Sequence, residues 1–151
     1  MEDLTIKNKT KFVFSLLFIV GLFLILFLSW KTNPNLKESA FIPTWLSEWT
    51  DQIRNNRRRT AVPFVGLGLL IGLYLVIIKR VRFWVWFYTW GALCIIVIIA
   101  EAGQYFLPSR SPDIKDVIWG SIGAIGGLLT SFLGWQITHI IKTISYGHKT
   151  D

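Results

Sequence analysis

FWVWFYTWGALCIIVIIA, residues 83–100, is the stretch that decides the fold, because it contains neither an acidic nor a basic side chain. About 20 such residues in a helix cross the hydrocarbon core of a bilayer. Within that core a segment must satisfy its own backbone hydrogen bonds, so we predict a transmembrane helix here. Three other runs share this uncharged, apolar character, namely residues 12–30, 60–78 and 117–138.

The composition agrees with several membrane crossings. Apolar residues make up 52% of the 151 residues and charged residues 17%, and the mean hydropathy is +0.49. A soluble domain of this length rarely shows that balance. Residues 12–30 exceed the apolar region of a signal peptide and precede no convincing cleavage site, so we interpret them as a retained helix. We therefore predict an all-α membrane protein, a single domain over residues 1–151 that forms a four-transmembrane-helix bundle.

Cysteine and histidine usage argues against several kinds of chemistry. Cys94 is the single cysteine and lies within the third run, so the sequence holds no disulfide framework and no metal-spaced Cys/His set. We expect no cofactor and no metal. The net charge of +7 comes from basic residues that flank the apolar runs in small groups, as anionic lipid headgroups favour. The membrane lipid bilayer is the expected partner, and nucleic acid is not.

The one long hydrophilic joint covers residues 31–59. Its segment Thr44–Arg54 predicts a short interfacial amphipathic helix between helices 1 and 2, with tryptophans as anchors at the membrane surface. A surface loop with a few buried aromatic residues is the alternative. The apolar face of this segment consists of Trp45, Leu46, Trp49 and Ile53. The three arginines that follow, Arg57, Arg58 and Arg59, are candidate contacts for anionic headgroups.

Orientation follows from the positions of the basic residues. Four crossings place the N-terminus, the Lys79–Arg82 joint and the C-terminal tail on one side, and the joints 31–59 and 101–116 on the other. Lys and Arg residues divide evenly between the two sides. Because the first helix usually dominates and more lysines precede it than closely follow it, we expect cytoplasmic N- and C-termini.

Polar residues gather between the third and fourth runs. Glu101 and Gln104 are three positions apart and share a helical face, so both side chains can point into the bundle. Carboxylates at membrane depth are costly unless paired or hydrated, which makes them functional candidates. The alternatives are structural: Glu101 ends its helix in a wet ion pair, and Asp113 caps the next helix. The predicted polar site consists of Glu101, Gln104, Arg110, Asp113 and Asp116.

Small residues recur along one face of the fourth run. Spacings of three and four residues place them in a stripe that lets a neighbouring backbone come close, the main source of packing in lipid. We predict that this helix is central and packs against the second and third runs through Gly120, Gly123, Gly127 and Ser131. Gly134 continues the same stripe.

The stretch from Glu101 to Gly127 resembles the VanZ-like family, small multi-pass bacterial membrane proteins named for an association with resistance to the glycopeptide teicoplanin. The shared features are a Glu-x-x-Gln, an Arg-containing turn, an Asp-x-x-Asp and a glycine-rich helix. Pro63-Phe64 with Gly66 resembles a weaker family feature. One departure is Gly120-Ser121, where the family usually has Asn-Thr.

The resemblance implies a multi-pass protein of the bacterial cytoplasmic (inner) membrane. We expect it to bind a lipid-linked or anionic envelope component, or a partner membrane protein, and so to affect the cell wall, surface polysaccharide or glycopeptide susceptibility. The sequence shows no Ser-His-Asp, Cys-His or HExxH set, which favours binding over catalysis. The alternative is a membrane-embedded enzyme whose carboxylate cluster acts on a lipid-linked glycan.

Overall fold

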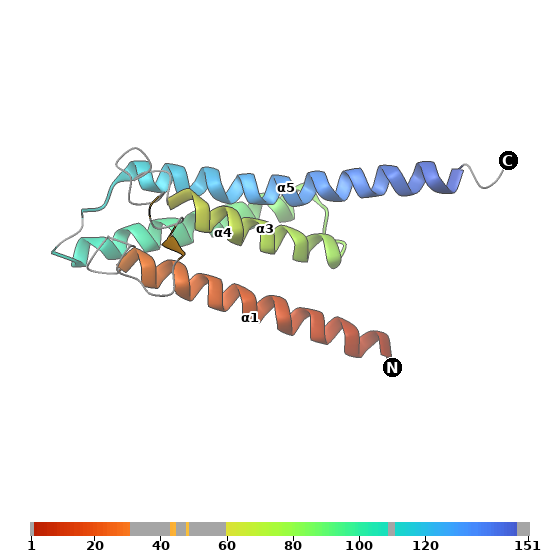
Figure 1. The fold of residues 1–151 in the computed structure, drawn as a ribbon, viewed down its shortest axis with the longest axis horizontal. Helices are drawn as coiled ribbons and strands as arrows, with labels where there is room; N and C mark the ends of the chain where they lie inside the picture. Colours follow the sequence, from red (N-terminus) through yellow and green to blue (C-terminus); the bar gives the residue numbers. More distant parts are fainter. Residues whose placement is uncertain (1, 31–42, 45–47, 49–59, 109–110, 148–151) are drawn as a thin grey trace.

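The computed structural model describes residues 2–30, 43, 44, 48, 60–108 and 111–147. Within these ranges the regular elements are all helical, and four long helices lie roughly along one axis (Figure 1). The helices are α1 (Glu2–Trp30), α3 (Ala61–Ile77), α4 (Phe83–Ala102) and α5 (Ile114–Gly147), and the 3-10 turn η3 (Gly103–Phe106) follows α4. The all-α prediction is therefore confirmed for the described residues.

Three of the helices contain spans long and apolar enough to cross a membrane: Asn8–Trp30, Phe83–Phe106 and Ile114–Thr143. Helix α3 is apolar but shorter, with 17 residues, near the lower end of what a bilayer core requires. The α1 and α5 helices extend past the uncharged runs, because a charged residue outside the lipid core does not interrupt a helix. Most of the predicted interfacial segment, Thr44–Arg54, lies outside the described residues.

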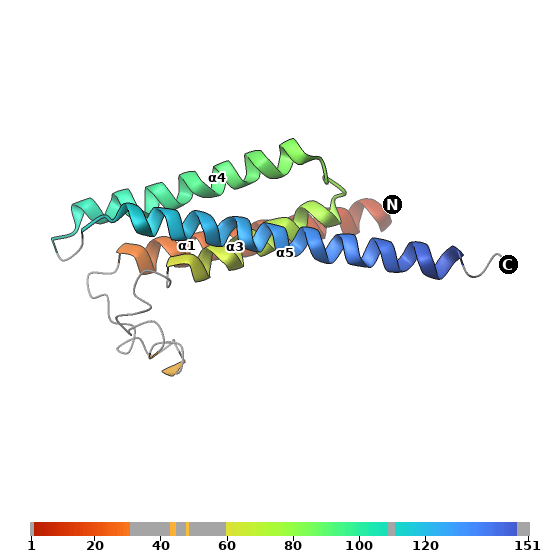
Figure 2. The ribbon, with the colours of Figure 1, turned by 90° about the horizontal axis from the view of Figure 1, so that it is seen from above.

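Helix α3 ends in a tight turn that leads directly into α4. Lys79 adopts a positive φ of 57°, and its N–H donates to the Val76 carbonyl at 3.0 Å. The Arg80 N–H donates to the Leu75 carbonyl at 2.8 Å. This pair of hydrogen bonds is the Schellman arrangement, which satisfies carbonyls left open at a helix end. Helix α4 then begins at Phe83, so α3 and α4 form a hairpin (Figure 2).

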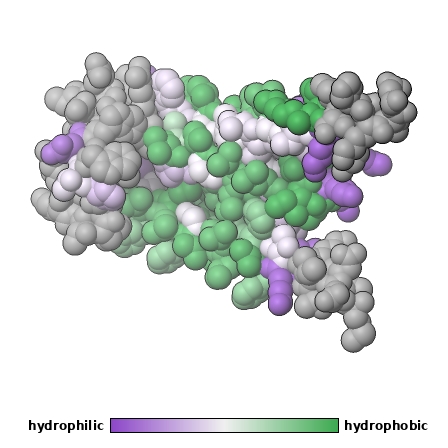
Figure 3. Space-filling view, turned by 45° about the vertical axis from the view of Figure 1, so that its right-hand side comes forward, coloured by the Kyte–Doolittle hydropathy of each residue, from purple (hydrophilic) through white to green (hydrophobic). Residues whose placement is uncertain are grey.

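The outside of the bundle is apolar. Large hydrophobic side chains are exposed along every long helix, as Phe23 of α1, Leu73 of α3, Ile95 of α4 and Leu133 of α5 illustrate. Figure 3 shows hydrophobic residues over the middle of the visible face and hydrophilic residues toward its ends. An apolar exterior between polar ends suits a hydrocarbon solvent and would be costly in water.

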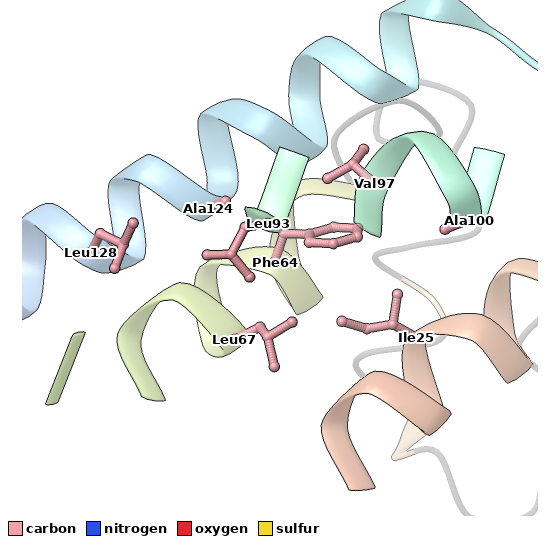
Figure 4. Close-up of a cluster of buried hydrophobic side chains, with 8 residues drawn as sticks. All are labelled: Ile25, Phe64, Leu67, Leu93, Val97, Ala100, Ala124 and Leu128. Carbon is pink, nitrogen blue, oxygen red and sulfur yellow. The ribbon is translucent and has the colours of Figure 1, made fainter. Parts of the chain in front are cut away.

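All four long helices contribute to a small buried core (Figure 4). Phe64, Leu93 and Val97 are its largest fully buried side chains. The other members are Ile25, Leu67, Ala100, Ala124 and Leu128. Ile25 is the one buried residue of α1 among its described side chains, and Figure 1 shows α1 leaning away from the other helices toward its N-terminal end.

Helices α3 and α5 make the closest contact in the bundle. Gly123 and Gly127 are buried, and a Cβ added to them would meet the backbone carbonyls of Ala61 and Val65. At Gly120 an added Cβ would lie 2.7 Å from Cγ1 of Val97, so this glycine accommodates α4. The predicted stripe thus lies where two neighbouring helices approach.

Ser131 closes this contact with a hydrogen bond between helices. Its hydroxyl donates to the Leu69 carbonyl of α3 at 2.9 Å and lies 3.3 Å from the Gly127 carbonyl of its own helix. Gly134, the next residue of the stripe, is exposed and has nothing within 4 Å of an added Cβ. The close approach of α3 and α5 therefore covers Gly123 to Ser131 and not Gly134.

Candidate functional site

The predicted polar residues lie at the end of the bundle where α4 stops and α5 starts. Glu101 is in the last turn of α4 and Gln104 is in η3, and both are buried, with 5% and 7% of their surface exposed. Glu101 is therefore not a wet interfacial carboxylate. Burying a carboxylate is costly unless hydrogen bonds compensate it, so its contacts determine what it does.

Glu101 connects α4 to the start of α5. Its Oε1 accepts a hydrogen bond of 2.8 Å from the Asp113 backbone N–H, twelve positions further along the chain. Its Oε2 lies 3.4 Å from Nε2 of Gln104. Hydrogen bonds to an ionised acceptor are the strong ones in proteins. Glu101 thus fixes where the connection returns to the bundle.

Asp113 caps α5. Its Oδ1 accepts the Lys115 N–H at 2.9 Å, and its carbonyl accepts the Asp116 N–H at 2.9 Å. A side-chain acceptor just before a helix satisfies an N–H that has no partner inside the helix, and a negative charge there suits the helix dipole. The cap is one of the two interpretations that the sequence offered for Asp113.

Asp116 lies in the first turn of α5, where its charge also suits the dipole. The residue is partly exposed, but its Oδ1 is buried. Arg110 lies outside the described residues, as do Arg57, Arg58 and Arg59. The structure therefore brings Glu101, Gln104 and Asp113 together by hydrogen bonds and places Asp116 one turn into the helix that Asp113 caps.

The end of α1 completes the cluster, a contribution that was not among the predictions from the sequence. Gln104 Nε2 donates to the Ser29 hydroxyl at 3.0 Å. The Ser29 hydroxyl and the Trp30 indole N–H both donate to the Ala100 carbonyl, at 3.0 and 3.1 Å. Carbonyls in the last turn of a helix lack partners inside the helix, and here two side chains of α1 satisfy one of them.

Gly103 allows this contact with α1. A Cβ at this position would overlap the indole ring of Trp30, so the ring lies directly over the start of η3. A sequence signal for the contact does exist. Alternating helix directions bring the end of the first run to the side where the third run ends, and that first run closes with Ser29 and Trp30.

Exposed residues adjoin the buried cluster in sequence, next to Gln104 and next to Asp113. Tyr105, Phe106 and Ile114 are 78%, 83% and 71% exposed, and Lys115 is also exposed. The rings of Tyr105 and Phe106 lie edge to face, with centroids 5.9 Å apart. These four residues, which we call the lip, offer apolar surface and one cation next to the hydrogen-bonded cluster.

The part of the chain that the structure describes holds no group of side chains that could bind a metal ion. No three His, Cys, Asp or Glu side chains in these ranges lie close enough together to share one ion. The cluster built from Glu101, Gln104, Asp113 and Ser29 instead holds three helix ends together.

These features define the class: an all-helical membrane protein with a small apolar core, a lipid-compatible exterior and a hydrogen-bonded polar cluster at one end of the bundle. The chain belongs to the VanZ/LLP1 family, whose model matches residues 12–135. The match covers the polar cluster and the glycine stripe, and it also includes α1 from residue 12 and the joint 31–59. Comparisons with curated proteins and with solved structures give no significant match.

Proposed function

We propose that this VanZ/LLP1 protein binds an anionic, lipid-linked component of the bacterial envelope at the lip, without changing it chemically. The observation that carries the proposal is that the exposed lip lies next to the hydrogen-bonded cluster of Glu101, Gln104 and Asp113. Apolar rings at a membrane surface suit the lipid portion of such a ligand, and the Lys115 ammonium suits its phosphate.

Binding fits the carboxylates better than acid–base catalysis does. Glu101 Oε1 and Asp113 Oδ1 both accept backbone N–H groups that position the start of α5. A general acid or base must exchange protons with its substrate, and changing the charge of either group would weaken these contacts. The cluster therefore acts as a support for the lip. A membrane-embedded enzyme acting on a lipid-linked glycan is the alternative to be tested against this.

Four crossings in the cytoplasmic membrane are part of the proposal. Helices α3 and α5 run in the same direction, because Ala61 faces Gly123 and Leu69 faces Ser131. Helix α4, which lies between them in the sequence, runs the opposite way. A helix of 17 residues that packs along a transmembrane helix in this way spans the core with little tilt. The N-terminus and the C-terminus then share the cytoplasmic side, and the lip lies on the other.

Cysteine labelling tests this topology. Cys94 is replaced by alanine, and single cysteines are placed at Thr44, Arg80, Ser111 or Lys142, all of which are exposed. Arg80 and Lys142 should react with a membrane-impermeant maleimide from one side, and Thr44 and Ser111 from the other. If α3 does not cross, Thr44 should instead label from the same side as Arg80, which would overturn the four-crossing arrangement.

Binding is tested with the full chain reconstituted in nanodiscs and a polyprenyl-diphosphate-linked sugar as the probe. Lys115→Gln should weaken binding about fivefold, the effect of one cation near a charged headgroup. Replacing Tyr105 and Phe106 together by alanine should weaken it further, because the apolar contact is lost. Lys142→Gln is the matched control, since Lys142 is an exposed cation on α5 at the far end, and it should change nothing.

The same samples separate binding from catalysis. After incubation with and without a divalent metal, the probe should be recovered intact by mass spectrometry. A cleaved or transferred sugar would establish the enzyme alternative. Equal binding by the wild type, Lys115→Gln and the aromatic double variant would remove the lip as the binding surface.

A further inference from the structure

A second surface, which combines apolar and basic residues, lies at the opposite end of the bundle, where α3 turns into α4. An apolar groove of about 270 Å³ runs between α4 and α5 there. Val81 and Phe83 line it on the side of the turn, Trp86 and Trp90 along α4, and Leu129 and Phe132 along α5. The groove thus begins at the turn and continues along the helices into the apolar part of the molecule.

Cations lie beside the end of this groove, at the turn. Lys79, Arg80 and Arg82 are exposed, and the last two flank Val81, which lines the groove. The Trp86 indole N–H donates to the Arg80 carbonyl at 3.0 Å, so the backbone that carries these cations is held against the groove wall. Glu101, Asp113 and Asp116 lie at the other end of the bundle.

A series of aromatic rings continues from the groove along α5. Contacts lead from Trp86 to Phe132, with centroids 5.4 Å apart, then to Trp135 and on to His139. Tryptophan and histidine rings with one apolar and one polar side suit the headgroup level of a membrane. The apolar groove therefore ends beside the basic turn, and the ring series continues from the groove along α5.

We propose that this surface is a binding site for an anionic phospholipid of the surrounding bilayer. One acyl chain lies in the groove between α4 and α5, and the phosphate lies at Arg80 and Arg82. Inside a membrane, moving an acyl chain from bulk lipid into a groove brings no hydrophobic gain. Selectivity must then come from the headgroup, and the cations at the mouth of the groove provide it through charge complementarity.

Native mass spectrometry of the full chain in detergent measures the binding of phosphatidylglycerol against phosphatidylcholine. The wild type should prefer phosphatidylglycerol. Arg80→Gln combined with Arg82→Gln should lower the affinity for phosphatidylglycerol roughly 30-fold, about fivefold for each charge removed, and leave the phosphatidylcholine affinity unchanged. Both side chains are exposed, and glutamine keeps the Arg80 carbonyl that Trp86 uses, so this variant should fold.

Two controls isolate the groove from general surface charge. Lys9→Gln combined with Lys11→Gln removes two exposed cations of α1, outside the groove, and should preserve the preference. Leu129→Trp should fill the groove and reduce phosphatidylglycerol binding, whereas Ile95→Trp, at an exposed α4 position outside the groove, should not. The proposal is overturned if the arginine double variant keeps the preference, if the lysine double variant loses it equally, or if both tryptophan variants behave alike.

Discussion

Glu101→Ala should destabilise the protein by about 2–3 kcal/mol, measured as the free energy of unfolding in detergent. The substitution removes the carboxylate oxygen that accepts the Asp113 N–H. It also removes the oxygen that lies near Nε2 of Gln104. A buried donor that loses its partner costs about 1–3 kcal/mol, and hydrogen bonds to charged groups are at the upper end of that scale. The loss should appear as a frayed start of α5, detectable as faster amide exchange at Asp113 and the residues that follow.

Glu101→Gln separates the charge from the hydrogen bond. The amide oxygen of glutamine can still accept the Asp113 N–H, so we expect a loss of only about 1 kcal/mol. Glu48→Ala is the matched control, because Glu48 is an exposed acid in the long joint and its removal should have little effect. If Glu101→Ala unfolds no more easily than Glu48→Ala, the carboxylate does not hold the helix ends together.

Gly127→Ala should destabilise the bundle by about 3 kcal/mol. The added Cβ would meet the Val65 carbonyl and would lie 2.6 Å from the Leu69 nitrogen. Both are backbone atoms, which cannot move aside as a flexible side chain can, so α3 and α5 must separate along the contact. Overpacking a tight interior typically costs about 1–3 kcal/mol, and a clash with backbone belongs to the upper part of that range.

Gly126→Ala is the control one residue away. An added Cβ at Gly126 has nothing within 4 Å, and alanine is a better helix former than glycine. This variant should be neutral or more stable by up to about 1 kcal/mol. The measurement is again unfolding in detergent, with folding yield as a second readout. Equal stability of the two variants would contradict the close approach of α3 and α5 at Gly127.

The sequence was sufficient for the fold class and for the helix contact. Uncharged runs of about 20 residues predict membrane helices because a segment in the hydrocarbon core must satisfy its own backbone hydrogen bonds. The spacing of Gly123 and Gly127 indicates a close neighbour because few other arrangements use such a stripe. Periodicity could not show that Gly134 would lie outside the contact. Two crossing helices touch over a limited length, and their crossing point depends on the whole bundle.

The candidate site was predicted only in part. Its residues were found from their spacing, and the short connection explains why Glu101 and Asp113 meet. Whether Glu101 is wet or buried could not be predicted, since that depends on how α1 packs. The hydrogen bond between Gln104 and Ser29 depends on the same packing of α1, because the two residues are 75 positions apart.

The contact between α3 and α5 can form only late in the synthesis of the protein, because α5 is made last. Ser131 and Leu69, which it joins, are 62 positions apart. At about 5–20 residues per second, a ribosome needs roughly 3–12 s to proceed from one to the other. During this interval the face of α3 that packs against Gly123 and Gly127 lacks the helix that covers it. The nascent chain must therefore be kept from pairing with other membrane helices until α5 has been synthesised, and a truncation before Gly123 would leave that face open permanently.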